Sequence, residues 1–301
     1  MKKVCLVFNP VSGSGNAPQD LEKIRAQLID HVALDIRFTA QDKSAAAITE
    51  EAIREGAELV IAAGGDGTVS QVASLLTNTD VPMAVIPRGT ANAFAAALNL
   101  PTDISKACDV VLSGQPQKID GATCQGDFMT LLAGIGLEAA TIDQTDRETK
   151  QKFGVLAYLA TAVKQLKQLQ SFSASLDCGD RQAEYKNVLA ITVANLAPST
   201  SILAQGTKTV SGKDGLLDVT ILTMPAADDP VLGVLSASYE LFQSALQDNE
   251  AQHPAVTSLR TPTVTIQTDP PQQLVLDGEM KGKTPVFFEA IPDSLWVQMP
   301  A

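Results

Sequence analysis

Hydrophobic and polar positions form two kinds of pattern along the first 120 residues. Short apolar runs are typical of buried strands, and they occur at Val4–Phe8, Ala33–Phe38, Leu59–Ala63 and Met83–Pro87. Between them, apolar side chains recur at the spacing of a helix. The expected helices lie around Leu21–Ile29, Ser44–Glu55, Thr68–Leu76, Thr90–Leu98 and Ser105–Leu112. Strands that alternate with helices in this way form βαβ units around a mainly parallel sheet.

Beyond about residue 120 the pattern changes to short strand-like runs separated by turn residues. These runs are Phe128–Gly134, Phe172–Cys178, Asn187–Asn195, Leu216–Leu222, Thr263–Gln267 and Gln273–Leu276. Two helical segments interrupt them, at about Arg147–Leu169 and Pro230–Leu246. Runs of this length and spacing favour an antiparallel sandwich or a barrel-like domain.

The length of 301 residues suggests two domains at roughly 150 residues each. We expect an α/β domain of the Rossmann-like type over residues 1–123 and a β-rich sandwich domain over residues 124–290. Ser294–Met299 reads as one more strand, so the last segment, about 291–301, could return to the first domain.

The charge balance narrows the choice of partners. Lys and Arg number 22 against 34 Asp and Glu, so the formal net charge is −12. A protein that binds nucleic acid needs a basic surface, and we therefore expect no nucleic-acid partner. The apolar run at Val4–Phe8 is too short for a signal-peptide core, and the four cysteines show no paired spacing. We expect a cytoplasmic protein.

Three polar loops follow strands of the first domain, namely Asn9–Gly15, Gly64–Thr68 and Pro87–Asn92. Glycines let backbone N–H groups approach an anion, and the helix starts add partial positive charge, so each loop is a candidate phosphate site. Arg88 could neutralise phosphate charge. One such loop alone is better explained by a tight βα turn with a helix cap, whereas three at one sheet edge favour a ligand. Neither G-x-x-x-x-G-K-[ST] nor G-x-G-x-x-G is present.

Seven motifs, in order, carry a resemblance to a known family. They are Asn9-Pro10-x-Ser12-Gly13, Gly64-Gly65-Asp66-Gly67-Thr68, Gly89-Thr90-Ala91-Asn92-Ala93-Phe94-Ala95, Gly134-Ile135-Gly136, Lys152-Phe153-Gly154-Val155-Leu156-Ala157-Tyr158, Asp214-Gly215-Leu216-Leu217-Asp218-Val219 and Asp277-Gly278-Glu279. The sequence resembles the diacylglycerol kinase catalytic-domain superfamily, and within it the soluble bacterial lipid kinases. NAD kinases share the GGDGT motif, but the later motifs are not expected together in them.

The resemblance implies an ATP site in the cleft between the two domains. It casts Gly64, Gly65, Asp66, Gly67 and Thr68 as the loop that holds the ATP phosphates, with Asn9, Ser12, Gly89 and Thr90 nearby. It also casts Asp277 as the base that deprotonates the lipid hydroxyl, with Glu279 as its companion. Spacing alone favours a standard hairpin turn at Asp277-Gly278, whereas the whole series of motifs favours the catalytic role.

Asp214 and Asp218 flank another Asp-Gly turn, and family members place a structural magnesium in this region. Carboxylate oxygens suit Mg²⁺, but the same residues could simply begin a strand, and both interpretations stay open. The chain also departs from the family, because Ala93 and Ala96 stand where family members usually have aspartate and arginine. This departure puts in doubt any charged contact from that helix.

We therefore expect an ATP- and Mg²⁺-dependent kinase that phosphorylates the hydroxyl of a diacylglycerol-like lipid at a membrane surface. The alternatives are a NAD kinase-like enzyme, a sphingoid-base kinase, and a nucleotide-binding regulator that has lost catalysis. The sequence leaves open whether the protein forms a homodimer. The 147–169 helix carries Lys150, Lys152, Lys164 and Lys167 beside leucines, so it could lie on the inner membrane face or pack on the second domain.

Overall fold

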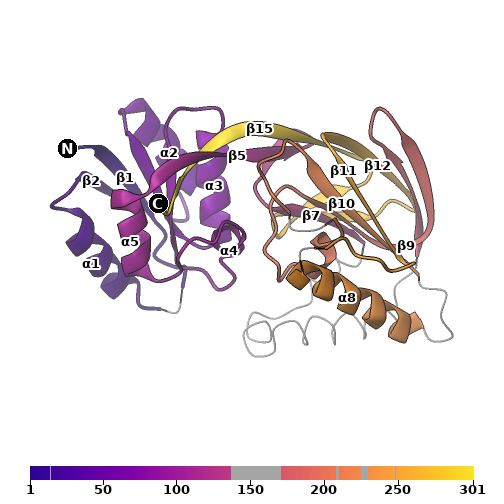
Figure 1. Ribbon diagram of the computed structural model, residues 1–301. Helices are drawn as coiled ribbons and strands as arrows, with labels where there is room; N and C mark the ends of the chain where they lie inside the picture. Colours follow the sequence, from indigo (N-terminus) through magenta and orange to yellow (C-terminus); the bar gives the residue numbers. More distant parts are fainter. Residues whose placement is uncertain (14, 137–170, 208–209, 225–229, 248) are drawn as a thin grey trace. The chain divides into compact units, whose positions relative to one another are not determined.

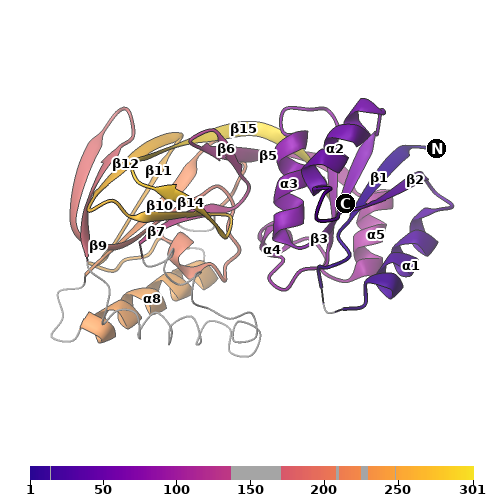
Figure 2. The same cartoon turned by 180° about the vertical axis from the view of Figure 1, so that it is seen from behind.

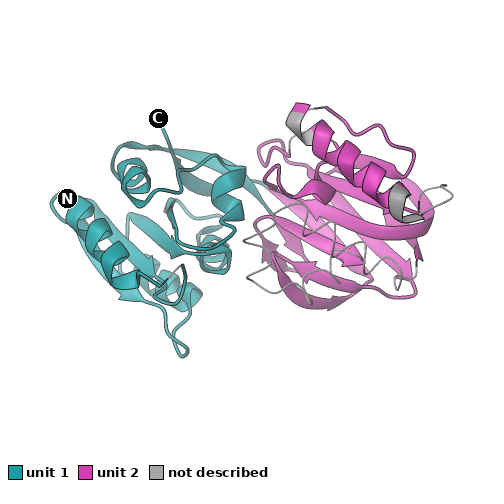
Figure 3. Cartoon of the chain, turned by 90° about the horizontal axis from the view of Figure 1, so that it is seen from below, with its two compact units in different colours: residues 1–121, 292–301 teal, residues 122–291 magenta. Residues whose placement is uncertain are grey.

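The computed structural model describes residues 1–13, 15–136, 171–207, 210–224, 230–247 and 249–301 (Figure 1). The helix expected at 147–169 lies outside the described residues. The chain divides into two compact units, shown in Figure 3. Unit 1 contains Met1–Gly121 and Pro292–Ala301, and unit 2 contains Ala122–Ile291.

Unit 1 is built on a parallel sheet with the strand order β2–β1–β3–β4–β15. Its strands are β1 (Lys3–Phe8), β2 (Ala33–Phe38), β3 (Leu59–Gly64) and β4 (Met83–Pro87), and the end of β15 (Val286–Met299) joins β4 through Val297 and Met83. The predicted parallel α/β sheet is confirmed. The strand order reverses between β1 and β3, which makes this the place where open α/β sheets bind ligands.

Helices cover both faces of this sheet. On one face lie α1 (Ala17–Leu28) and α5 (Ile104–Ser113), and on the other lie α2 (Ala45–Arg54) and α3 (Asp66–Leu76), as Figures 1 and 2 show. A further short helix, α4, spans Ala93–Ala97. Val4, Leu6 and Phe8 of β1 alternate toward the face of α1 and α5, where they join one buried cluster with Ile24 and Leu28. Alternation along β1 thus lets a single strand supply apolar side chains to both faces of the sheet.

Unit 2 is antiparallel. Its strands run in the order β14–β13–β7–β9–β8–β12–β15, and β10 pairs with β9 and β11. The strand β5 (Gln115–Cys124) begins in unit 1 and ends in unit 2. The bounds of the other strands are β6 (Asp127–Met129), β7 (Leu132–Gly136), β8 (Phe172–Asp177), β9 (Gln182–Ala194), β10 (Leu217–Thr223), β11 (Val256–Thr261), β12 (Thr263–Asp269), β13 (Gln273–Leu276) and β14 (Glu279–Lys283). The predicted β-rich second domain is confirmed.

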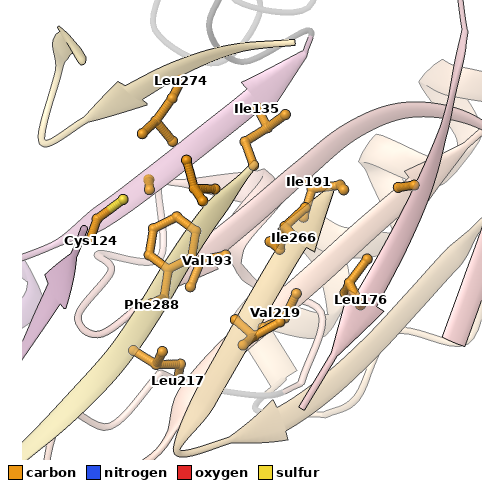
Figure 4. Packing of buried hydrophobic residues seen from close by; sticks show 14 of the residues in the cluster. Cys124, Ile135, Leu176, Ile191, Val193, Leu217, Val219, Ile266, Leu274 and Phe288 are labelled. Carbon is orange, nitrogen blue, oxygen red and sulfur yellow. The ribbon is translucent and has the colours of Figure 1, made fainter. Parts of the chain in front are cut away.

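The core of unit 2 is a cluster of buried apolar side chains that its strands contribute. In β8, burial alternates residue by residue, so Phe172, Ala174 and Leu176 point inward and the residues between them face outward. Figure 4 shows part of this core, with Ile191 and Val193 of β9, Val219 of β10, Ile266 of β12 and Phe288 of β15.

The helix α8 (Pro230–Gln247) packs Val234, Ala237 and Leu241 on a second apolar cluster that includes Leu189 and Leu222. A 3-10 turn at Ile202–Ala204 contributes to the same cluster. Among the described residues, no helix combines the length and the apolar character that crossing a bilayer requires.

Candidate functional site

Three of the predicted loops meet at the carboxyl edge of the sheet in unit 1. Asn9 directly follows β1, Gly65 directly follows β3, and Arg88 directly follows β4. Since β1 and β3 are the strands between which the order reverses, the first two loops flank the position where a ligand of such a sheet lies.

Asn9 connects the first loop to the start of α3. Its side-chain amide donates from Nδ2 to Oγ1 of Thr68 over 2.9 Å, and its backbone N–H donates to the carbonyl oxygen of Ala63 over 2.9 Å. Thr68 is 6% exposed, so its hydroxyl is used within the protein. In this arrangement Asn9 and Thr68 position the loops.

The second and third loops touch backbone to backbone. A Cβ placed on Gly89 would lie 2.7 Å from Cα of Gly65, closer than real Cβ atoms come to other heavy atoms. Asn92 closes the third loop, since its Oδ1 accepts from the Gly89 N–H over 2.7 Å. Asp66 fixes the helix that follows, because its Oδ1 accepts from the N–H of Phe94 over 3.1 Å. Glycine at 89 is therefore a packing requirement of this edge.

Gly67 differs from these glycines. It lies in the first turn of α3, it is exposed, and a Cβ added to it would meet nothing within 4 Å. Helix interiors disfavour glycine by roughly 0.5–1 kcal/mol relative to alanine. The packing of the chain thus gives no reason for glycine at this position, whereas close approach of a ligand to the backbone would.

Arg88, which the sequence offered as a residue to neutralise phosphate charge, has internal contacts in the structure. Its side chain is 1% exposed, and its guanidinium donates to Asp20, to the carbonyl oxygen of Asn9 and to Ser12. It also lies 4.3 Å from the ring centroid of Phe8. Arg88 therefore holds the loop after β1 from inside, instead of facing solvent to meet a phosphate.

In unit 2, Asp277 and Gly278 form the two-residue turn between β13 and β14. Both have positive φ, 46° and 88°, as the tight turns that join antiparallel strands require. The turn interpretation of the Asp277-Gly278 pair is therefore confirmed. A turn does not exclude a chemical role for the Asp277 side chain, which points toward residues 130–132 at the start of β7.

The carboxylate of Asp277 accepts four hydrogen bonds. Oδ2 accepts from the N–H and the hydroxyl of Thr130 over 2.8 and 2.7 Å, and Oδ1 accepts from the N–H groups of Leu131 and Leu132 over 2.9 and 3.1 Å. Glu279, two residues later, is exposed, and Lys281 lies 3.9 Å from its Oε2. The carboxylate of Asp277 thus holds the 130–132 segment, and the base role of Asp277 stays a prediction.

Comparison with known proteins decides the family. The diacylglycerol kinase catalytic domain model matches residues 3–124, and the YegS C-terminal NAD kinase beta sandwich-like domain model matches residues 132–299. The chain belongs to the YegS-like family of lipid and diacylglycerol kinases.

Individual relatives agree with this assignment. An uncharacterized protein of Synechocystis sp. (strain ATCC 27184 / PCC 6803 / Kazusa) is 39% identical over 98% of this chain and 70% of its own length. The "Probable lipid kinase YegS-like" of Stenotrophomonas maltophilia (strain K279a) is 30% identical over 90% of this chain and 88% of its own length.

Solved structures of diacylglycerol kinase type show the same fold. Two such structures from Bacillus anthracis str. Sterne align with TM-scores of 0.82 and 0.74, at 24% and 19% identity. Each alignment covers 99% of this chain, and the solved chains are covered over 95% and 97% of their length.

The metal site that the resemblance to YegS-like kinases implies does not fit this chain. Between Asp214 and Asp218 lies the guanidinium of Arg260, whose Nη2 is 2.5 Å from Asp214 Oδ2 and whose Nε is 2.9 Å from Asp218 Oδ1. Among the described residues, no group of three or more His, Cys, Asp or Glu is arranged to hold a metal ion. The arginine supplies positive charge at the place where a magnesium ion was predicted, so Asp214 and Asp218 with this partner do not fit a divalent ion.

Proposed function

We propose that this member of the YegS-like kinase family transfers the γ-phosphoryl group of ATP, with Mg²⁺, to the hydroxyl of a diacylglycerol-like lipid. The observation that carries the proposal is the meeting of three glycine-containing loops at the carboxyl edge of the sheet in unit 1, two of them beside the strand-order reversal. The family assignment supports ATP as donor and a lipid as acceptor.

The nucleotide phosphates would bind at the first turn of α3. The first N–H groups of a helix have no partner within the helix, and the helix dipole places partial positive charge there. Exposed Gly67 lets phosphate oxygens approach the backbone, and the partly exposed Gly65 and Asp66 flank it. The contacts of Asn9, Thr68, Arg88 and Gly89 keep the loops in place around it.

Glu279 would be the proton acceptor in unit 2. A general base must have an oxygen available for the proton that it removes, and those of Asp277 each accept two hydrogen bonds already. As the lipid oxygen forms its bond to the γ-phosphorus, the bond to the bridging oxygen of ADP breaks and the hydroxyl proton passes to Glu279. Asp277 positions Glu279 by fixing the turn against residues 130–132. Mg²⁺ bound to the ATP phosphates would neutralise the charge that develops on them.

The test is phosphoryl transfer from labelled ATP and Mg²⁺ into a panel of lipid alcohols in mixed micelles. The panel contains diacylglycerol and a sphingoid base, and NAD is the soluble acceptor. Label in diacylglycerol supports the proposal, label in the sphingoid base changes the acceptor, and label in NAD alone replaces the lipid kinase with a NAD kinase-like enzyme. ATP binding without transfer to any acceptor would favour a nucleotide-binding regulator, to which the uncharged Ala93 and Ala96 would then contribute.

A further inference from the structure

We infer that Arg260 is the permanent cation of the Asp214–Asp218 turn, so that unit 2 of this chain folds without the divalent ion that its family is expected to carry there. The proposal concerns the folding of unit 2 and is independent of whether the protein is a lipid kinase. It rests on the strand register, on the contacts of one guanidinium and on the burial of one carboxylate.

The strand register places the partners opposite each other. Asp218 of β10 pairs directly with Arg260 of β11 in an antiparallel ladder, where cross-strand side chains on one face meet. Asp214 comes four residues before Asp218, in the turn that leads into β10. One arginine can therefore reach both carboxylates from a position that the backbone fixes.

The guanidinium contacts both carboxylates through different nitrogens. Nε donates to Asp218 Oδ1 over 2.9 Å and Nη2 donates to Asp214 Oδ2 over 2.5 Å. The planar donors of arginine fit carboxylates in this way, while a lysine would offer a single point charge. The hydroxyl of Thr207 donates to the same oxygen of Asp218. The donors around Asp218 are thus a cation and a hydroxyl of the chain itself.

Burial explains why a cation is needed. The side chain of Asp218 is 1% exposed, and its Oδ2 is buried without a hydrogen-bond partner among the described residues. Loss of solvation raises the pKa of Asp218, while Thr207 and Arg260 oppose this rise. A buried carboxylate without a counter-charge is strongly unfavourable, so the turn requires either a metal ion or an arginine. This chain has the arginine.

Removal of Arg260 should convert the Asp214–Asp218 turn into a metal site. In Arg260→Met the two carboxylates lose their counter-charge, and the unpartnered Oδ2 of Asp218 becomes an available ligand oxygen. We expect the melting temperature without divalent ions to fall by about 5 °C or more. We expect Mn²⁺ to restore most of that loss and to bind with a stoichiometry of one.

The experiment measures thermal unfolding and Mn²⁺ binding, by electron paramagnetic resonance, without ATP or lipid. Wild type should melt at the same temperature in EDTA and in Mn²⁺ at matched ionic strength, and should bind no Mn²⁺ tightly. Arg54→Met removes an exposed arginine from α2 and should leave both results unchanged. One tightly bound Mn²⁺ in wild type, with a melting temperature that falls in EDTA, would overturn the inference. If Arg260→Met does not fold, the wild-type measurement still decides.

Discussion

Nε of Arg88, directly after β4, donates to Oδ2 of Asp20 in α1 over 3.0 Å, and the arginine side chain is 1% exposed while that of the aspartate is 22% exposed. The same guanidinium donates from Nη1 to the carbonyl oxygen of Asn9 over 2.7 Å and to Oγ of Ser12 over 3.2 Å. The ion pair therefore anchors the loop after β1 between α1 and β4. Asn9 and Ser12 are among the residues proposed to surround the nucleotide, so the pair connects folding stability to ligand binding.

Asp20→Asn keeps the shape of the side chain and removes the charge that neutralises Arg88. Removing one partner of a buried pair costs about 3–5 kcal/mol, and we expect about 2 kcal/mol here because Asp20 is partly exposed. ATP affinity should fall on the order of tenfold, because the first loop loses its anchor. Urea unfolding and calorimetric titration with ATP measure the two effects. Glu22→Gln, on the exposed surface of the same helix, is the control, and equal behaviour of the two variants would remove this role.

Gly67→Ala tests whether glycine at position 67 is needed for ligand binding or for folding. The added methyl group meets nothing within 4 Å and favours the helix, so the free energy of unfolding should stay equal or rise by about 0.5–1 kcal/mol. ATP affinity should nevertheless fall on the order of tenfold, because the methyl group would occupy the space of a phosphate oxygen. Unchanged ATP binding in this stable variant would place the phosphates elsewhere.

Gly89→Ala, in contrast, should lower the stability of the protein. Its Cβ would lie 2.7 Å from Cα of Gly65, so the two loops must separate, at a cost of about 1–3 kcal/mol. Loss of ATP binding would then follow from loss of loop packing. Thermal unfolding of both glycine variants, measured together with ATP titration, checks this contrast. A Gly89→Ala protein as stable as wild type would show that the contact between the loops is not needed.

Asp277→Asn and Glu279→Gln test how the base function is divided. Glu279→Gln should lower kcat about 10²–10⁴-fold and leave stability and ATP affinity unchanged, because this carboxylate is exposed. Asp277→Asn should also lower the transfer rate, but it should in addition destabilise the protein by about 1–3 kcal/mol, since an amide NH₂ cannot accept from the 130–132 N–H groups. The measurements are initial transfer rates and urea unfolding. Full activity of Glu279→Gln would return the base role to Asp277.

Segments whose burial repeats regularly could be predicted from the sequence. The expected strands Ala33–Phe38 and Met83–Pro87 coincide with β2 and β4. All five residues of β4 are buried, and the partly buried Leu34 and Ile36 of β2 pack against the core of unit 1. A strand that is stabilised only by backbone hydrogen bonds to its neighbour could not be predicted in this way. All five residues of β14 are exposed, so Glu279–Lys283 carries no apolar pattern, and its strand conformation comes from its ladder with β13.

The site was predictable only where local sequence determines it. Glycine loops after strands are local features, and the structure brings three of them to one edge. The partners of Arg88 and Arg260 lie 68 and 42 residues away, so the ion pairs depend on tertiary packing that no local pattern reports. The same limit explains the metal prediction at Asp214 and Asp218. The carboxylates were visible in the sequence and their arginine was not.

The buried cysteines predict loss of stability at alkaline pH. Burial raises the thiol pKa from 9.0 to about 11 for Cys5 and Cys108 and to about 12 for Cys124. Above pH ~9 the unfolded chain releases these protons while the folded chain keeps them, so the unfolded state binds fewer protons and stability falls as pH rises toward the folded pKa values.

Each thiol should contribute about 1.4 kcal/mol of lost stability per pH unit between pH ~9 and ~11. The measurement is the free energy of urea unfolding from pH 7 to 11 for wild type and for the variant with Ala at positions 5, 108 and 124. The variant starts less stable because it lacks three buried sulfur atoms, but its stability should decline less steeply above pH ~9. Parallel curves for the two proteins would mean that the thiols ionise equally in both states, and that other groups cause the alkaline loss.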